Sequence, residues 1–196
     1  DPFFEKLRFE YFIIEHSNFI WNYEYVDVEP SRGTLVTNLS LIVQTKNVVD
    51  KLIKMKHPKT VILASSGAVY GLGNNDLKGN NYIYSDLKLM QEEKIGEACS
   101  GTSTNLIITR IFNLSGNGIS KINTFAIAEM VSRAFKNQKL QIKSKYLVHR
   151  RYCDISQFLN LLLDLSRNNF IGVIDSGGIK IELRELVQTI IEELGS

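Results

Sequence analysis

The 196-residue sequence has only two cysteines and three prolines, and it contains no long hydrophobic run. Cys99 and Cys153 are far apart and lack Cys-x-x-Cys or Cys/His spacing, which argues against a disulfide framework and a metal site. No run of about 18 apolar residues occurs, and the first residues lack the basic and apolar regions of a signal peptide. We therefore expect no membrane span and a cytoplasmic location.

The chain also lacks a strong excess of either charge. Lysine and arginine total 23 against 21 aspartates and glutamates, for a formal charge of +2. The basic residues are scattered rather than gathered into a stripe that could follow a phosphate backbone, so no nucleic-acid partner is expected. With 44% hydrophobic residues, the composition excludes disordered, collagen-like and coiled-coil proteins and predicts a globular fold.

Short apolar runs alternate with amphipathic segments along the chain. Continuous apolar residues predict strands at 11–14, 60–64, 105–112 and 170–175. Helical spacing of apolar residues predicts helices at 34–56, 84–98, 124–137, 155–166 and 182–194, with a loop at 71–81 and an extended stretch at 141–152. Strands that alternate with helices of this length predict an α/β protein with a largely parallel sheet.

Three junctions after predicted strands are candidate ligand sites, because open parallel sheets bind ligands beyond the carboxyl ends of their strands. These junctions are 65–71, the segment with Asn113, Gly116 and Gly118, and 176–178. Tyr84 and Lys88 follow the first junction and lie one turn apart on one face of a predicted helix. The first junction is therefore the strongest candidate for chemistry.

A tyrosine, a lysine and a serine in this arrangement suit proton transfer. A tyrosine hydroxyl with a pKa of ~10 is a poor acid or base at neutral pH, but a nearby lysine ammonium stabilises the phenolate and lowers that pKa. A serine hydroxyl can share a substrate oxygen with the tyrosine. Such a group exchanges a proton with a carbonyl/alcohol pair, which is the protein's part in a hydride-transfer reaction.

The order of the motifs resembles that of the extended short-chain dehydrogenase/reductases, the NAD-dependent epimerase/dehydratase family that acts on nucleotide sugars. The motifs are Ser65-Ser66-Gly67-Ala68-Val69-Tyr70-Gly71, Tyr84-x-x-x-Lys88, Arg110-Ile111-Phe112-Asn113-x-x-Gly116-x-Gly118 and Arg151-Tyr152-x-Asp154. The similarity extends over residues 9 to 190, and 9–14 are similar to the family's central strand. The resemblance implies a Rossmann-like parallel sheet.

The resemblance implies catalytic roles for three residues. Ser66 would hydrogen-bond the reacting sugar oxygen, and Tyr84 would be the catalytic acid or base. Lys88 would lower the pKa of that tyrosine and hold the nicotinamide ribose.

Other matching residues would bind the cofactor and the substrate. The cofactor, NAD or NADP, would lie along Ala64, Ser65 and Asn38 together with Tyr84 and Lys88. Asn38 matches the asparagine that opens the helix before the Ser-Ser strand. A nucleotide-sugar substrate would contact Asn113 and either Arg150 or Arg151, because a guanidinium fork suits a diphosphate.

The family's glycine-rich turn, G-x-x-G-x-x-G, is missing, because none of the 13 glycines completes it. That turn binds the dinucleotide pyrophosphate at a helix N-terminus. The family would carry about 60 to 80 residues before Tyr11, and Glu15-His16-Ser17 replace the small apolar residues that end its central strand. We therefore expect a sheet that is incomplete at its N-terminus, through truncation, incomplete recording or degeneration, and weak or no NAD binding.

The resemblance also implies a domain organisation and an activity. Residues 1–113 would form a partial dinucleotide-binding domain, and 114–196 mainly a smaller substrate lobe with some elements returning to the sheet. Gly67-Ala68 stand where the family's 4,6-dehydratases carry an Asp-Glu pair, which favours an epimerase or keto-sugar reductase over a dehydratase. The alternative is a non-catalytic interaction or regulatory module that kept the fold and lost the cofactor.

Family members commonly dimerise through two helices, which here are 34–56 and 84–98. Each offers apolar residues off its main stripe, namely Leu41, Val43 and Val48 on the first and Leu87, Met90 and Ile95 on the second. A homodimer would cover them, and the alternative is that neighbouring elements of the same chain do so.

Two other positions are expected to be structural. Asp154 precedes an apolar helix and is expected to begin it rather than to take part in chemistry. Gly177-Gly178 is expected to be a turn between a strand and a helix rather than a phosphate-binding loop.

Overall fold

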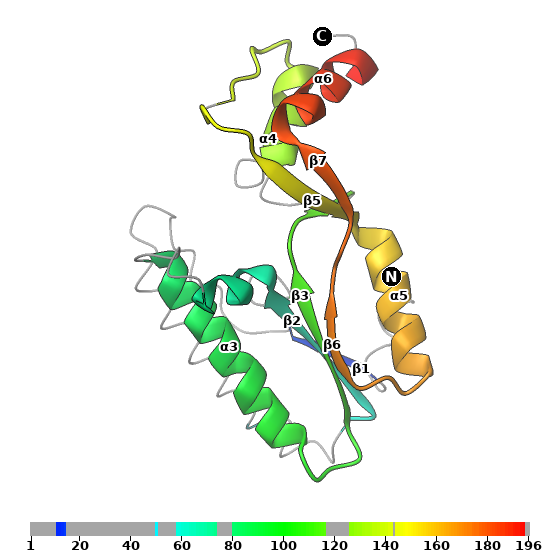
Figure 1. Ribbon diagram of the computed structural model, residues 1–196. Helices are drawn as coiled ribbons and strands as arrows, with labels where there is room; N and C mark the ends of the chain where they lie inside the picture. The colour runs from blue at the N-terminus through cyan, green and yellow to red at the C-terminus, as the bar shows by residue number, and fades with distance from the viewer. Residues whose placement is uncertain are drawn as a thin grey trace. The chain divides into compact units, whose positions relative to one another are not determined.

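The computed structural model describes residues 11–14, 50, 58–73, 80–116, 126–142 and 144–194. Its elements are β1 (Tyr11–Ile14), β2 (Thr60–Ser66), η1 (Gly67–Gly73), α3 (Asn80–Cys99), β3 (Asn105–Ile111), β4 (Leu114–Ser115), α4 (Ala126–Phe135), β5 (His149–Asp154), α5 (Ile155–Arg167), β6 (Gly172–Asp175), β7 (Ile179–Glu182) and α6 (Leu183–Leu194), as Figure 1 shows. They form two compact units, 1–111 with 162–175 and 112–161 with 176–196. The expected α/β fold is confirmed.

The first unit is built on a parallel sheet of order β1-β2-β3-β6. Ile62 pairs with Ile107 and Leu63 with Ile108, so the two apolar runs that predicted neighbouring strands do lie side by side. Both are nearly continuous apolar runs, as expected of strands that are buried on both faces.

The helix α3 covers one face of this sheet beside β2 and β3 (Figure 1). Val61 and Leu63 of β2 pack with Ile95 and Cys99 of α3, and all four side chains are buried. Leu106 and Ile108 of β3 lie against the same cluster. Because successive side chains of a strand point to opposite faces, every second residue of each strand contributes to this core.

The second unit has a three-stranded sheet of order β4-β5-β7, in which β5 is parallel to β4 and antiparallel to β7. Its core joins two helices, since Met130 and Ala134 of α4 pack with Leu186 and Ile190 of α6. Tyr152 of β5 lies against this cluster, and burial raises the pKa of its hydroxyl. The apolar spacing of the two helices predicted that each buries one face, but it did not predict which residues that face contacts.

Local capping fixes the ends of α5. The backbone N–H of Gln157 donates to Asp154 Oδ1 at 2.9 Å, which confirms that Asp154 begins this helix as an N-cap. The helix ends at Arg167, and Asn169 beyond it has a left-handed φ of 54°, while the N–H of Phe170 donates back to the carbonyl of Leu165 at 2.9 Å. Asparagine tolerates this conformation better than most residues, so a glycine is not needed there.

Two expectations about the connections differ from the structure. Residues 71–81 were expected to form a loop, but η1 continues to Gly73 and α3 begins at Asn80, one turn before Tyr84. Asparagines are typical of loops and equally typical of helix starts, so their composition did not separate the two. Gly177-Gly178 connects two strands, β6 and β7, rather than a strand and a helix.

The expected helix 34–56 lies outside the described residues except for Asp50, which is helical.

Candidate active site

The serine, tyrosine and lysine predicted to be catalytic come from the end of β2 and the first turns of α3. Ser66 is the last residue of β2, and its Oγ accepts a hydrogen bond from the Ala68 N–H at 3.2 Å. Tyr84 is half-buried on α3, one turn before Lys88 and on the same face. The structure therefore places both parts of the motif in the first unit, at the carboxyl end of the strand where ligands bind in open parallel sheets.

Lys88 is buried, with a relative exposure of 2%. Its ammonium donates to the carbonyl oxygen of Ala64 at 2.9 Å and to Gln91 Oε1 at 3.3 Å. A buried cation is costly unless oxygen atoms replace its water shell, and these two acceptors do so. The cation is thus held against the end of β2 within one turn of the tyrosine.

Ser65, predicted to lie along the cofactor, points its hydroxyl towards α3 and donates to Glu92 Oε1. Glu92 is itself paired with Arg110 of β3. Arg110 Nε lies 3.1 Å from Glu92 Oε1, and Nη2 lies 2.7 Å from Oε2. This hydrogen bonding raises the pKa of the Arg110 guanidinium further above its ordinary value, so it remains a cation at any pH the protein withstands.

Tyr70 of η1 joins the same edge of the sheet. The guanidinium carbon of Arg110 lies over the Tyr70 ring, 4.8 Å from the ring centroid. The Tyr70 hydroxyl donates a hydrogen bond to Asp175 Oδ1 at 2.9 Å. Asp175 is the last residue of β6, so these contacts connect η1 to the carboxyl ends of β3 and β6.

Sequence reasoning missed Glu92 and Gln91, and it named Arg110 only as part of a motif, without a role. One signal was available: Glu92 follows Lys88 by one turn and continues the stripe that begins with Tyr84. No local pattern, however, joins Glu92 to Arg110, since they lie 18 residues apart on different elements.

The residues predicted to bind substrate lie in the second unit. Asn113 Nδ2 donates a hydrogen bond to the carbonyl oxygen of Arg151 at 3.0 Å. The guanidinium Nη1 of Arg151 donates in turn to the carbonyl oxygen of Gly178 at 3.1 Å. Arg150 pairs with Ile181 in the sheet and Arg151 with Lys180. Because neighbouring residues of a strand face opposite ways, the two arginines point to opposite faces of β5.

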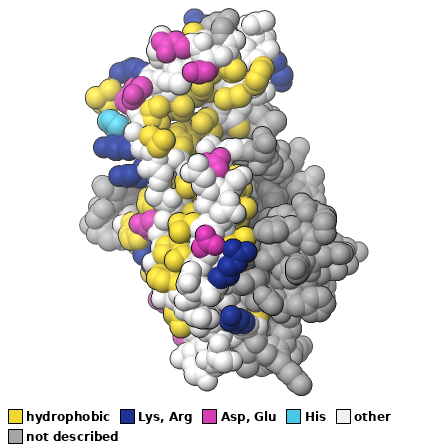
Figure 2. All heavy atoms as spheres, turned by 90° about the vertical axis from the view of Figure 1, so that its right-hand side faces the viewer, with side chains coloured by type: hydrophobic (Ala, Val, Ile, Leu, Met, Phe, Trp, Pro, Cys, Tyr) yellow, Lys and Arg dark blue, Asp and Glu magenta, His cyan; other side chains and the backbone are white. Residues whose placement is uncertain are grey.

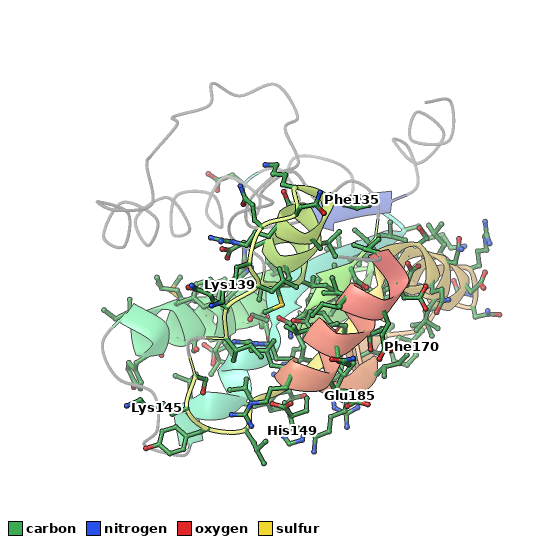
Figure 3. The ribbon with its side chains drawn as sticks, turned by 90° about the horizontal axis from the view of Figure 1, so that it is seen from above. Phe135, Lys139, Lys145, His149, Phe170 and Glu185 are labelled. Atoms are coloured by element: carbon green, nitrogen blue, oxygen red, sulfur yellow. The ribbon has the colours of Figure 1, made fainter. Side chains whose placement is uncertain are left out.

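The first three residues of β5, His149, Arg150 and Arg151, are basic and exposed. His149 is exposed and directed away from the ribbon in Figure 3, as is Lys145. Figure 2 shows a histidine side chain in cyan on the surface, with both lysine or arginine and aspartate or glutamate side chains near it. Asn38 lies outside the described residues, so the structure gives it no position.

Residues 32–170 match the NAD dependent epimerase/dehydratase family. The chain belongs to this family. A comparison with curated protein sequences gives no match. Within the described ranges, no helix is long and apolar enough to cross a membrane, and no group of three or more His, Cys, Asp or Glu side chains could hold a metal ion.

Three solved structures of similar fold have 18% to 21% sequence identity to this chain, so the similarity concerns the fold alone. The UDP-N-acetylglucosamine 4-epimerase of Methanobrevibacter ruminantium, solved with UDP-N-acetylmuramic acid, has a TM-score of 0.71 over 95% of this chain and 61% of its own. The dTDP-glucose 4,6-dehydratase of Bacillus anthracis, solved with NAD, has a TM-score of 0.68 over 83% and 54%. MoeE5, solved with UDP-glucose and NAD, has a TM-score of 0.69 over 86% and 59%. The chain thus spans between 54% and 61% of the length of these three proteins.

Proposed function

We propose that this chain is the catalytic part of an NAD-dependent enzyme that epimerises a nucleotide sugar or reduces a keto sugar. The observation that carries the proposal is the buried ammonium of Lys88, fixed on the Ala64 carbonyl one turn from Tyr84. Gly67-Ala68 in place of an acidic pair favours these reactions over dehydration. Relatives of the same fold solved with UDP-sugars support the substrate class.

In this mechanism, Tyr84 exchanges a proton with the reacting sugar oxygen, and Ser66 hydrogen-bonds the same oxygen. Lys88 stabilises the tyrosine phenolate by its positive charge, and its fixed position keeps that charge from moving away during the reaction. Tyr84 and Lys88 would hold the nicotinamide end of the bound cofactor, which would supply reversible hydride transfer at the sugar carbon in epimerisation and, as NADH, the hydride in keto-sugar reduction. Hydroxyls and an ammonium at the strand end fit the nicotinamide ribose, whereas the sequence has no glycine-rich turn for the pyrophosphate.

Cofactor and substrate contacts are part of the same proposal. Ala64, Ser65 and Asn38 would lie along NAD or NADP, and Ser65 would do so through its main chain because its hydroxyl donates to Glu92. Asn113 and either Arg150 or Arg151 would contact the nucleotide sugar. Only one of the two arginines can face a given diphosphate, since they lie on opposite faces of β5.

A cytoplasmic homodimer through 34–56 and 84–98 also remains a proposal. On the second of these helices, Leu87 and Ile95 are already buried in the single chain, and Ile95 packs against Val61 and Leu63. Met90 is half-buried. Of the three apolar residues singled out on this helix, only Met90 thus remains accessible to a partner, and the half-buried Leu89 lies beside it in the sequence.

A second candidate is a non-catalytic interaction or regulatory module with the same fold. An activity assay separates the two. The natural protein that contains these 196 residues is incubated with NAD and, separately, UDP-glucose, UDP-N-acetylglucosamine or dTDP-glucose. A parallel incubation contains NADH and a nucleotide 4-keto sugar, and the products of all reactions are resolved by chromatography and NMR. An epimer formed without net change in NADH, or a keto sugar reduced with NADH consumption, supports the enzyme. Failure of every nucleotide sugar to react in a protein that binds NAD contradicts it.

The 196-residue chain by itself is expected to bind NAD weakly or not at all, because backbone N–H groups of a glycine-rich turn normally hold the pyrophosphate. Isothermal titration calorimetry of the chain with NAD measures this. AMP and nicotinamide mononucleotide, titrated as matched controls, show which half of the cofactor is lost. Submicromolar affinity for NAD would show that other residues replace the turn.

A further inference from the structure

The face of the first unit's sheet that carries the core changes from apolar to charged at the carboxyl ends of its strands. Val61 and Leu63 face α3, and Ser65 continues the same alternation; on β3, Leu106 and Ile108 are followed by Arg110. Ser65 and Arg110 are register partners on adjacent strands. The stripe of α3 that meets them runs Cys99, Ile95, Glu92, Lys88, Tyr84. Glu92 therefore lies where the core ends and the candidate site begins.

Glu92 makes directional contacts with both strands at this boundary. Its carboxylate accepts from Ser65 Oγ of β2 and from Nε and Nη2 of Arg110 of β3. The side chains of the ion pair are 6% and 19% exposed, so water screens the interaction little. Apolar packing is non-directional and tolerates small sliding and rotation of a helix, whereas a bidentate arginine–carboxylate pair fixes both.

We propose that Glu92 is a positioning residue, which through Ser65 and Arg110 sets the height and rotation of α3 over the strand ends and so places Tyr84 and Lys88 for proton transfer. Ala64 and Ser65 are consecutive, and α3 meets the first through Lys88 and the second through Glu92. A loss of the Glu92 contacts therefore loosens the helix one turn from the lysine and two turns from the tyrosine. This inference rests on the proposed function of Tyr84.

The test compares two variants of the natural protein that disturb the same helix. Glu92→Gln removes the charge that pairs with Arg110, and Ile95→Ala removes apolar packing one turn further along the stripe without touching the ion pair. Glu92→Gln is expected to lower kcat roughly 10- to 100-fold, because small misplacements of reacting groups have effects of this size. KM for the nucleotide sugar is expected to stay within about threefold, since Glu92 is not proposed to touch substrate. Ile95→Ala, assayed well below its unfolding temperature, is expected to retain kcat within about threefold.

Equal losses of kcat in the two variants would show a merely structural role and overturn the inference. Arg110→Lys, which keeps the positive charge and loses the bidentate geometry, gives the same test if Glu92→Gln does not fold. Hydrogen exchange supplies a readout that is independent of turnover. Glu92→Gln is expected to speed exchange in the first half of α3, and Ile95→Ala in the second half. If the wild-type protein shows no turnover but the two variants differ in exchange in this way, only the proposed function is contradicted. If exchange changes in the same part of α3 in both variants, the positioning role is contradicted.

Discussion

Replacing Tyr84 by phenylalanine is expected to lower kcat by about a thousandfold in the natural protein, because acid–base catalysis by a positioned side chain contributes roughly 10²- to 10⁴-fold. The substitution removes only the hydroxyl and leaves the half-buried ring in place. The free energy of unfolding is therefore expected to change by no more than about 1 kcal/mol, the size of one hydrogen bond. Steady-state kinetics with a reactive nucleotide sugar and thermal unfolding measure the two effects.

Tyr82→Phe is the matched control for this prediction. Tyr82 precedes Tyr84 on the same helix, is 47% exposed and lies off the stripe that faces the sheet. Removal of its hydroxyl is expected to leave kcat unchanged. A Tyr84→Phe protein that retains more than about a third of wild-type kcat would show that another group transfers the proton.

Gly178→Ala is expected to destabilise the protein by about 2 to 4 kcal/mol, the largest effect on stability among the glycines that the structure describes in the second unit. Gly178 has a φ of 100°, a conformation that L side chains rarely adopt. A Cβ atom there would lie 2.3 Å from the carbonyl oxygen of Tyr152 and 2.8 Å from the backbone nitrogen of Cys153. Both contacts are with the backbone of β5, which cannot turn away as a flexible side chain could.

Gly101→Ala separates the steric clash from the conformational strain. Gly101 also has a positive φ, of 72°, but a Cβ atom there would meet nothing within 4 Å. Its replacement is expected to cost about 1 to 2 kcal/mol, which is the penalty of the left-handed conformation alone. Urea denaturation of both variants measures the difference, and equal losses of stability would show that β5 moves aside at little cost.

Much of the fold could be predicted because its signals are local. The apolar runs at 60–64 and 105–112 correspond to β2 and β3, and the helical spacing at 155–166 and 182–194 corresponds to α5 and α6. β4 has only two residues, and β7 alternates apolar and charged residues over its four positions. Neither strand therefore produces an apolar run long enough to detect. These strands exist because β5 lies between them and pairs with both.

The sequence by itself determined the α/β class, the alternation of strands and helices, and the placement of Tyr84 and Lys88 one turn apart after a strand that ends in two serines. Each of these depends on residues close together in the chain. Only the tertiary structure decided that Lys88 is held by the Ala64 carbonyl, that the Ser65 hydroxyl points to Glu92, and that Glu92 pairs with Arg110. The physical reason is that these partners lie on three separate elements, and their charges meet only after β2 pairs with β3 and α3 packs across both.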